Sequence, residues 1–183
     1  MKAKIMIPFL VLFLISCKKM FKDEEFSIKC VPYTGTELRI DGYYFMKRTG
    51  GGNDNKRFIS YFIFYSNGVS ATGNMETEKL NDVENRLATW SDNKYLPNNR
   101  YVWGPFSVLE NKLRMQYYEP SDYLKKRVEE LSCTILNDST FYLDKIHLVG
   151  SEKDGRSFST GEYRFKQFSP KPDSTNNFIP IKQ

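Results

Sequence analysis

The fold is decided by the stretch from Arg57 to Thr72, which reads RFISYFIFYSNGVSAT. From Arg57 to Ser66 the stretch is apolar on both faces, as in a central strand or a strand whose outer face is covered. Asn67-Gly68 follows, and this pair is the strongest short-range hairpin signal because both turn positions need a positive φ. The chain then returns as a second strand from Val69 to Thr72. The stretch therefore predicts an antiparallel hairpin.

Alternation of apolar and polar residues predicts further strands on both sides of this hairpin. Before it, a strand from Glu37 to Met46 places one set of side chains on a single face, namely Leu38, Ile40, Tyr44 and Met46. After it, strands are expected at 101–109, 112–118, 128–136, 141–149 and about 158–168, with a bulge at Gly161. Eight strands in hairpin order predict an all-β, eight-stranded antiparallel up-and-down barrel, since closure removes the sheet edges. A two-sheet sandwich is the alternative.

One segment breaks the strand pattern. Residues 76–90 carry apolar side chains at spacings of three and four, which predicts one inserted amphipathic helix with Leu80, Val83, Leu87 and Trp90 on its buried face. The barrel domain is expected at 37–168. Residues 169–183 hold three prolines and little pattern, so we expect a flexible C-terminal tail.

The N-terminus carries two export features. Lys2 and Lys4 precede a short apolar run from Ile5 to Ile15, which is typical of a signal peptide and too short to cross a bilayer as a helix. The sequence that ends at Cys17, Leu-Ile-Ser-Cys, resembles the bacterial lipoprotein box. That resemblance implies a signal peptide at 1–16, diacylglycerol on the Cys17 thiol, and stable membrane anchoring by two or more acyl chains. An ordinary signal peptide with an incidental cysteine is the alternative.

Residues 17–36 are expected to be a lipidated tether. Within it, Lys22-Asp23-Glu24-Glu25 resembles the signal that exports lipoproteins of Bacteroidetes to the cell surface, and Lys18 resembles lipoproteins released to the outer membrane. The expected location is the outer membrane, on its periplasmic or cell-surface face. The formal net charge of +5 falls to +3 when Lys2 and Lys4 are removed, which identifies no nucleic-acid partner.

The order of signal, lipobox, tether and eight-strand meander resembles the lipocalin-like lipoproteins of Bacteroidetes over Leu38 to Phe168. Lipocalins carry Gly-x-Trp in the first strand, packed against an arginine from the end of the barrel; here Gly42-Tyr43-Tyr44 and Arg164 are the matching residues. The resemblance implies that Arg164 stacks on Tyr44 and closes one end of the barrel. It also implies a small, largely apolar ligand.

Two functions are left open for a monomeric protein. In the first, interior side chains line a cavity for an apolar or aromatic small molecule, or else they fill the core; the candidates are Tyr44, Phe62, Phe64, Phe106, Met115, Tyr163 and Phe165. In the second, a surface accessory protein contacts envelope proteins or glycans through exposed aromatic side chains, for example Trp90, Trp103, Tyr117 and Tyr118.

No constellation for catalysis, metal or cofactor binding is found, and we expect a protein that is not an enzyme. His147 is the single histidine and alternates with two apolar neighbours, which speaks against a zinc site. Glu129 and Glu130 are adjacent, so in a strand they lie on opposite faces and cannot act as a carboxylate pair.

Two covalent modifications are expected beyond the lipid. Cys30 and Cys133 are the cysteines left after Cys17 in an exported chain, which predicts a disulfide, with two separate buried thiols as the alternative. The triplets that begin at Asp138 and Asp173 resemble the Bacteroidetes O-glycosylation sequon, with Ser139 and Ser174 as the acceptors; both are also good turn sequences.

Overall fold

A computed structural model describes residues 24–50, 56–90, 98–120, 126–151 and 158–179. The expected signal peptide and Cys17 lie outside these ranges. The strands are β1 (Gly42–Thr49), β2 (Arg57–Phe64), β3 (Val69–Glu76), β4 (Trp103–Leu109), β5 (Lys112–Tyr118), β6 (Val128–Asn137), β7 (Thr140–Leu148) and β8 (Gly161–Gln167), with one helix, α2 (Leu80–Ala88). They close into a barrel in sequence order, every neighbouring pair is antiparallel, and β1 pairs with β8. The predicted barrel is confirmed, and the sandwich is wrong.

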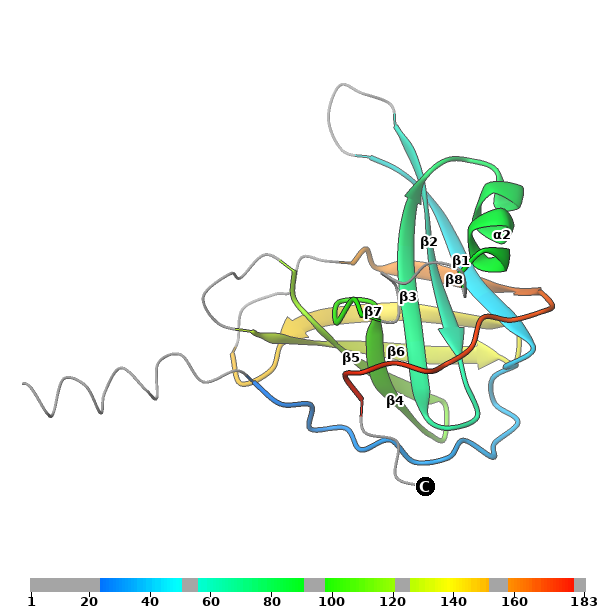
Figure 1. Ribbon diagram of the computed structural model, residues 1–183. Coiled ribbons are helices and arrows are strands. Elements are labelled where there is room, and N and C mark those ends of the chain that lie inside the picture. Colours follow the sequence, from blue (N-terminus) through cyan, green and yellow to red (C-terminus); the bar gives the residue numbers. More distant parts are fainter. Residues whose placement is uncertain (1–23, 51–55, 91–97, 121–125, 152–157, 180–183) are drawn as a thin grey trace, which may run out of the picture.

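The start of β1 differs from the prediction. The strand begins at Gly42 rather than at Glu37, although Leu38 still packs in the barrel interior and Ile40 packs against it. The backbone explains this, because Arg39 N donates to Asp138 O rather than to a neighbouring strand. Residues 33–41 therefore cap one end of the barrel, which we call the capped end, and Figure 1 shows this segment running below β4.

The expected bulge at Gly161 is also wrong. β8 starts at this residue and pairs with β7 in regular register, whereas the register shifts lie between β6 and β7, at Ser132/Cys133 and Ile135/Asn137. Gly161 has φ +147°, and a Cβ there would lie 2.6 Å from Met46 Sδ. The glycine is needed for that backbone conformation and for the close approach of β1.

The barrel interior is filled with aromatic and aliphatic side chains. Phe62 stands at its centre, and its ring centroid lies 5.0 Å from that of Tyr163 and 6.1 Å from that of Phe141. Phe141 and Tyr163 stack in turn at 5.1 Å. Rings at these separations and tilts pack as in other protein cores.

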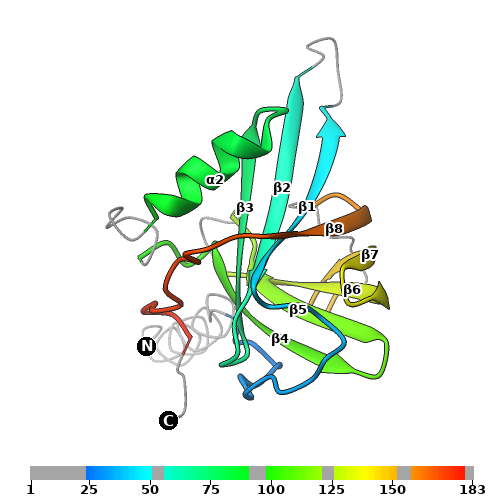
Figure 2. The ribbon, with the colours of Figure 1, turned by 90° about the vertical axis from the view of Figure 1, so that its right-hand side faces the viewer.

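A second hydrophobic cluster lies outside the barrel, between the outer face of β1 to β3 and helix α2. Figure 2 shows α2 beside β3. Val83, Leu87 and Trp90 of the helical segment face the odd-numbered side chains of β2 and β3, namely Ile59, Tyr61, Ile63, Val69 and Ala71. This covering explains why the stretch from Arg57 to Phe64 is apolar on both faces.

Both ends of the described chain pack on the barrel. At the N-terminal end, Ser27 N and Ile28 N donate to Gln116 Oε1, at 2.8 and 3.1 Å. At the C-terminal end, Ile179 is 5% exposed within the outer cluster. The expected loose tail is therefore wrong up to Ile179, because its apolar side chains are buried against the barrel; Figure 1 shows it crossing in front of β3 and β4.

Candidate functional site

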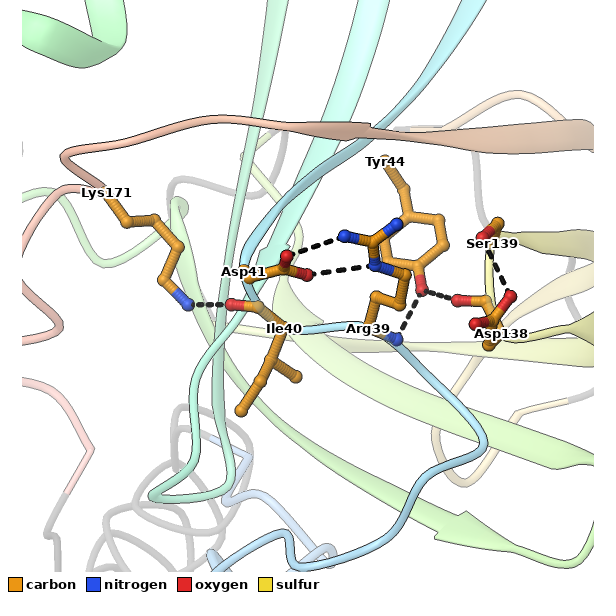
Figure 3. A network of polar contacts seen from close by, with 7 residues as sticks. All are labelled: Arg39, Ile40, Asp41, Tyr44, Asp138, Ser139 and Lys171. Atoms are coloured by element: carbon orange, nitrogen blue, oxygen red, sulfur yellow. Dashed lines mark hydrogen bonds and ion pairs between the residues drawn. The ribbon is translucent and has the colours of Figure 1, made fainter.

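The capped end of the barrel is closed by a network of polar contacts (Figure 3). Tyr44 Oη donates to Asp138 O at 2.6 Å and accepts from Arg39 N at 2.9 Å. Arg39 holds Asp41 through two hydrogen bonds, from Nε at 3.1 Å and from Nη2 at 2.6 Å. The hydrogen bonds from Arg39 lower the pKa of the Asp41 carboxyl. The network ties the start of β1 to the β6–β7 turn.

Lys171 completes this closure from the C-terminal segment. Its ammonium group donates to Ile40 O at 2.5 Å and to Phe64 O at 2.8 Å, and lies 4.5 Å from the ring centroid of Tyr65. Burial lowers the pKa of Lys171 to about 8. A buried amine that donates to two main-chain carbonyls fixes the segments that carry them.

The lipocalin-type closure through Arg164 is not formed. Arg164 is exposed and pairs with Glu162 at 2.6 Å on the same strand. The arginine that stacks on a ring at this end is Arg39, whose guanidinium lies 4.3 Å from the ring centroid of Phe165; the centroid of the Phe165 ring lies 5.3 Å from that of Tyr44. Successive side chains of a strand point to opposite faces, so Arg164 points outward while Phe165 points inward.

The interior side chains predicted to bind a ligand lie in the barrel core, and ligand binding by them stays a prediction. Phe165 is half-buried. The other six are between 0% and 2% exposed: Tyr44, Phe62, Phe64, Phe106, Met115 and Tyr163. They pack against one another in a single cluster. Of the two possibilities that the sequence left open for these residues, core filling fits their packing.

An opening in the barrel wall lies between β3 and the chain that leads into β4. β4 pairs with β3 at Val69 to Ala71 only, and Thr72 N donates to Val102 O at 2.9 Å. β3 continues to Glu76, paired with β2 on its other edge. Residues 73–76 of β3 have no partner strand on this edge among the described residues, and they border a lateral opening near the end of the barrel opposite the capped end.

The lateral opening contains a pocket of about 230 Å³ with aromatic walls. The described residues that line it are Ser60, Tyr61, Thr72, Gly73, Asn74, Arg86, Trp90, Asn99, Tyr101, Val102, Tyr118, Pro120 and Phe158. One of them leads inward: the Phe158 ring lies 5.7 Å from that of Phe62 and 5.4 Å from that of Tyr117, measured between ring centroids. The pocket thus reaches from the surface to the top of the aromatic core.

Gly73 makes room at this edge. A Cβ at Gly73 would lie 2.2 Å from the Tyr61 hydroxyl, because the Tyr61 ring lies across the glycine. Burial raises the pKa of Tyr61 to about 12, so the hydroxyl stays protonated at neutral pH. Trp90 Nε1 is buried and has no hydrogen-bond partner among the described residues. The pocket therefore offers aromatic faces together with hydrogen-bond donors.

The aromatic contacts proposed for an outer docking face are not on the surface. Trp90 is 2% exposed, Trp103 and Tyr117 are 0% exposed, and Tyr118 is half-buried. The first two belong to the outer cluster under α2, whereas Tyr117 points into the barrel and bonds Ser70 at 2.7 Å. The prediction was wrong because α2 covers Trp90 and Trp103 and because Tyr117 lies on the inner face of β5.

Cys30 and Cys133 are free cysteines, so the expected disulfide is not formed. Cys133 is buried in the barrel interior, on the face it shares with Leu131 and Ile135 as predicted. Cys30 lies outside the barrel wall, with Sγ 3.7 Å from Gly68 O. Burial raises the pKa of both thiols, that of Cys30 to about 11. Two thiols on opposite sides of a barrel wall cannot join.

The acidic residues and the histidine lie as alternation predicted. Glu129 is fully buried on the same face as Leu131, and Glu130 is on the opposite face, where it forms an ion pair with Arg114 at 2.7 Å. Burial alone would raise the pKa of Glu130, but hydrogen bonds from Arg114 and Gln116 outweigh it and lower the pKa.

His147 is half-buried between the inward-pointing Ile146 and Leu148. The described residues contain no cluster of three or more His, Cys, Asp or Glu suited to a metal ion.

The two expected glycosylation residues are both half-buried. Ser139 Oγ donates to Asp138 Oδ1 at 2.8 Å in the turn between β6 and β7. Ser174 Oγ accepts from Asn67 Nδ2 at 3.0 Å. Both triplets thus make turn contacts, and glycosylation at Ser139 and Ser174 stays a prediction.

Comparison with protein families, with curated proteins and with solved structures finds no match to this chain. Within the described ranges, no helix is both long enough and apolar enough to cross a bilayer. The functional assignment therefore rests on the barrel, the lateral opening and the N-terminal sequence.

Proposed function

We propose that the protein is a lipid-anchored lipoprotein of the outer membrane whose lipocalin-like barrel binds a small apolar or aromatic molecule, without catalysing a reaction on it. The proposal moves the binding site from the barrel centre to the lateral opening. One observation carries it: β3 extends past its pairing with β4, and among the described residues aromatic side chains line the gap.

The lining favours a ligand with a ring and a hydrogen-bond acceptor. Tyr101 and Phe158 supply ring faces, and the Trp90 indole N–H is a buried donor whose desolvation a ligand acceptor would offset. The volume of about 230 Å³ lies below the roughly 300 to 1,000 Å³ of sites for drug-sized ligands. We therefore expect a molecule of one or two rings.

The binding test uses the chain from residue 18 onward, which keeps every described residue and lacks acyl chains. The probe is 6-propionyl-2-(dimethylamino)naphthalene, a neutral two-ring dye with a carbonyl acceptor whose emission shifts to the blue in apolar sites. Tyr101 is 37% exposed at the opening, and Tyr142 is 43% exposed on β7. A lost aromatic contact of about 1 kcal/mol weakens binding about fivefold. We expect this loss in Tyr101→Ala and not in the matched control Tyr142→Ala.

Equal affinities in Tyr101→Ala and the parent chain would contradict the location of the site. Native mass spectrometry of the protein purified from its own host gives an independent result. A co-purified small molecule of defined mass, released by Trp90→Ala, supports the proposal, and a bare protein mass in several preparations speaks against it.

The lipid anchor is tested separately. Cys17→Ala should abolish incorporation of labelled palmitate and release the protein from the membrane fraction, because the thiol of Cys17 is the acceptor of the diacylglycerol. Cys30→Ala is the matched control and should keep the label. Persistent labelling of Cys17→Ala would show that the lipobox assignment is wrong.

A further inference from the structure

A second, larger space lies where the two ends of the described chain meet. This groove has a volume of about 490 Å³ and is lined by Glu25, Phe26, Ile28, Lys29, Cys30, Val31, Pro105, Tyr118, Phe178 and Ile179. Val31 is 63% exposed at its rim, beside the other apolar side chains that line the groove. The groove is distinct from the lateral opening, and of the lining residues only Tyr118 borders both.

Both walls of the groove are held in place by hydrogen bonds. The N-terminal wall is fixed to β5 through Gln116, and Glu24 Oε2 accepts from Val128 N of β6 at 2.9 Å. The C-terminal wall is fixed by Asn176 Oδ1, which accepts from the backbone N–H groups of Phe178 and Ile179 at 3.0 and 2.9 Å. Because the backbone of both walls is already ordered, little conformational entropy is lost when another apolar group covers the groove.

We propose that the groove is the membrane-facing surface of the protein and that acyl chains of the surrounding bilayer cover its apolar rim. This inference rests on the proposed anchor at Cys17. Six residues separate Cys17 from Glu24, and at about 3.5 Å per residue this tether spans at most about 25 Å. The wall that begins at Glu24 therefore cannot move far from the bilayer.

The lysines near the groove suit a membrane interface. Lys29 lines the groove, and the tether adds Lys18, Lys19 and Lys22; the acids Asp23, Glu24 and Glu25 lie between them, so four lysines against three acids leave this stretch a net charge of +1. Lysines bury their alkyl stems at an apolar boundary and keep the ammonium group among the headgroups, and each favours an anionic surface by about 1 kcal/mol. Apolar side chains such as Val31 and Phe178 can then enter the boundary between headgroups and acyl chains.

The test places a polarity-sensitive NBD fluorophore at the groove of the full, lipidated protein in vesicles of phosphatidylcholine and phosphatidylglycerol. Val31→Cys carries the label, in a Cys30→Ser background that removes the half-buried thiol. Tyr142→Cys, exposed on β7 away from the groove, carries it in the matched control. Flotation of the vesicles measures anchoring, and quenching by lipids with a nitroxide on the acyl chain measures contact with the bilayer interior.

We expect both labelled proteins to float and only the groove label to be quenched, with at least a threefold larger loss of emission than the control. Adding Phe178→Asp should reduce this quenching while flotation is unchanged. Flotation with equal quenching at the two positions overturns the groove inference and leaves the anchor intact. Failure to float overturns both. Emission that responds to protein density and not to the nitroxide would mean that a second copy covers the groove, which also overturns the inference.

Discussion

Replacement of Phe62 by alanine decides whether the barrel centre is core or binding site. The Phe62 side chain is 0% exposed and is surrounded by the rings of Phe64, Tyr117, Phe141, Phe158 and Tyr163. A buried aromatic side chain removes about 150 Å² from water, which at about 25 cal/mol per Å² corresponds to about 4 kcal/mol. Truncation in a packed core costs about 3 to 5 kcal/mol once the cavity is included. We expect a loss of about 4 kcal/mol.

The assay is urea unfolding followed by tryptophan emission, because the two tryptophans of the chain, Trp90 and Trp103, are both buried. With a slope of about 2 kcal/mol per molar urea, the loss should lower the unfolding midpoint by roughly 2 M. Phe58→Ala is the matched control: Phe58 lies on the same strand near the end opposite the cap and is half-buried, so about 1 kcal/mol is expected. If Phe62→Ala lowers the free energy of unfolding by less than about 1 kcal/mol, the barrel centre is not densely packed and the hypothesis of a central ligand cavity is supported.

Two further predictions concern the closure of the barrel and its close approaches. Because the pKa of Lys171 is about 8 against an ordinary value of 10.5, this residue holds more protons in the unfolded chain above pH 8, so its contribution to the free energy of unfolding rises from pH 8 to pH 10, whereas the raised pKa values of Cys30, Cys133 and Tyr61 act in the opposite direction. Relative to the parent chain, Lys171→Met should therefore lose stability between pH 8 and pH 10 and the exposed-lysine control Lys145→Met should not, in urea titrations at each pH; the same pH dependence in all three proteins would contradict the assignment. A Cβ at Gly104 would lie 2.0 Å from the main-chain oxygen of Gln116. Gly104→Ala should therefore lower the free energy of unfolding by about 1 to 3 kcal/mol and the midpoint of thermal unfolding by about 5 °C or more. Gly150→Ala is the control, because a Cβ there would meet no atom within 4 Å and only the φ of +69° is strained. It should lower the free energy of unfolding by about 1 kcal/mol, and equal losses in the two variants would count against steric crowding at Gly104.

The strands and their order followed from local pattern. Alternation predicted β5 to the residue, Lys112 to Tyr118, and the Asn67-Gly68 turn predicted the β2–β3 hairpin. The start of β1 was placed too early because Leu38 keeps the alternation after the backbone has left the ladder. Alternation reports which side chains are buried, and a capping segment buries them as a strand does.

The site could not be found in this way. The lateral opening depends on where β4 rejoins β3, and this register is set across the connection from residue 77 to 102 rather than by any local motif. The burial of Trp90 and Trp103 likewise depends on α2 folding back over β2. One signal was present in the sequence. Because β2 is apolar on both faces, another element had to pack on its outer face, and the amphipathic helix was the available element.

Closure of the barrel through β1 and β8 has a consequence for how the chain acquires its structure. Tyr44 pairs with Phe165, and Glu24 bonds Val128 across 104 residues, so many native contacts join distant parts of the sequence. Chains with such high contact order fold slowly, in milliseconds to seconds. Until β8 docks, β1 and β7 are open edges with unpaired N–H and C=O groups that can recruit another chain. The last strand therefore acts as the seal against aggregation, and a chain that ends before Gly161 would keep both edges exposed.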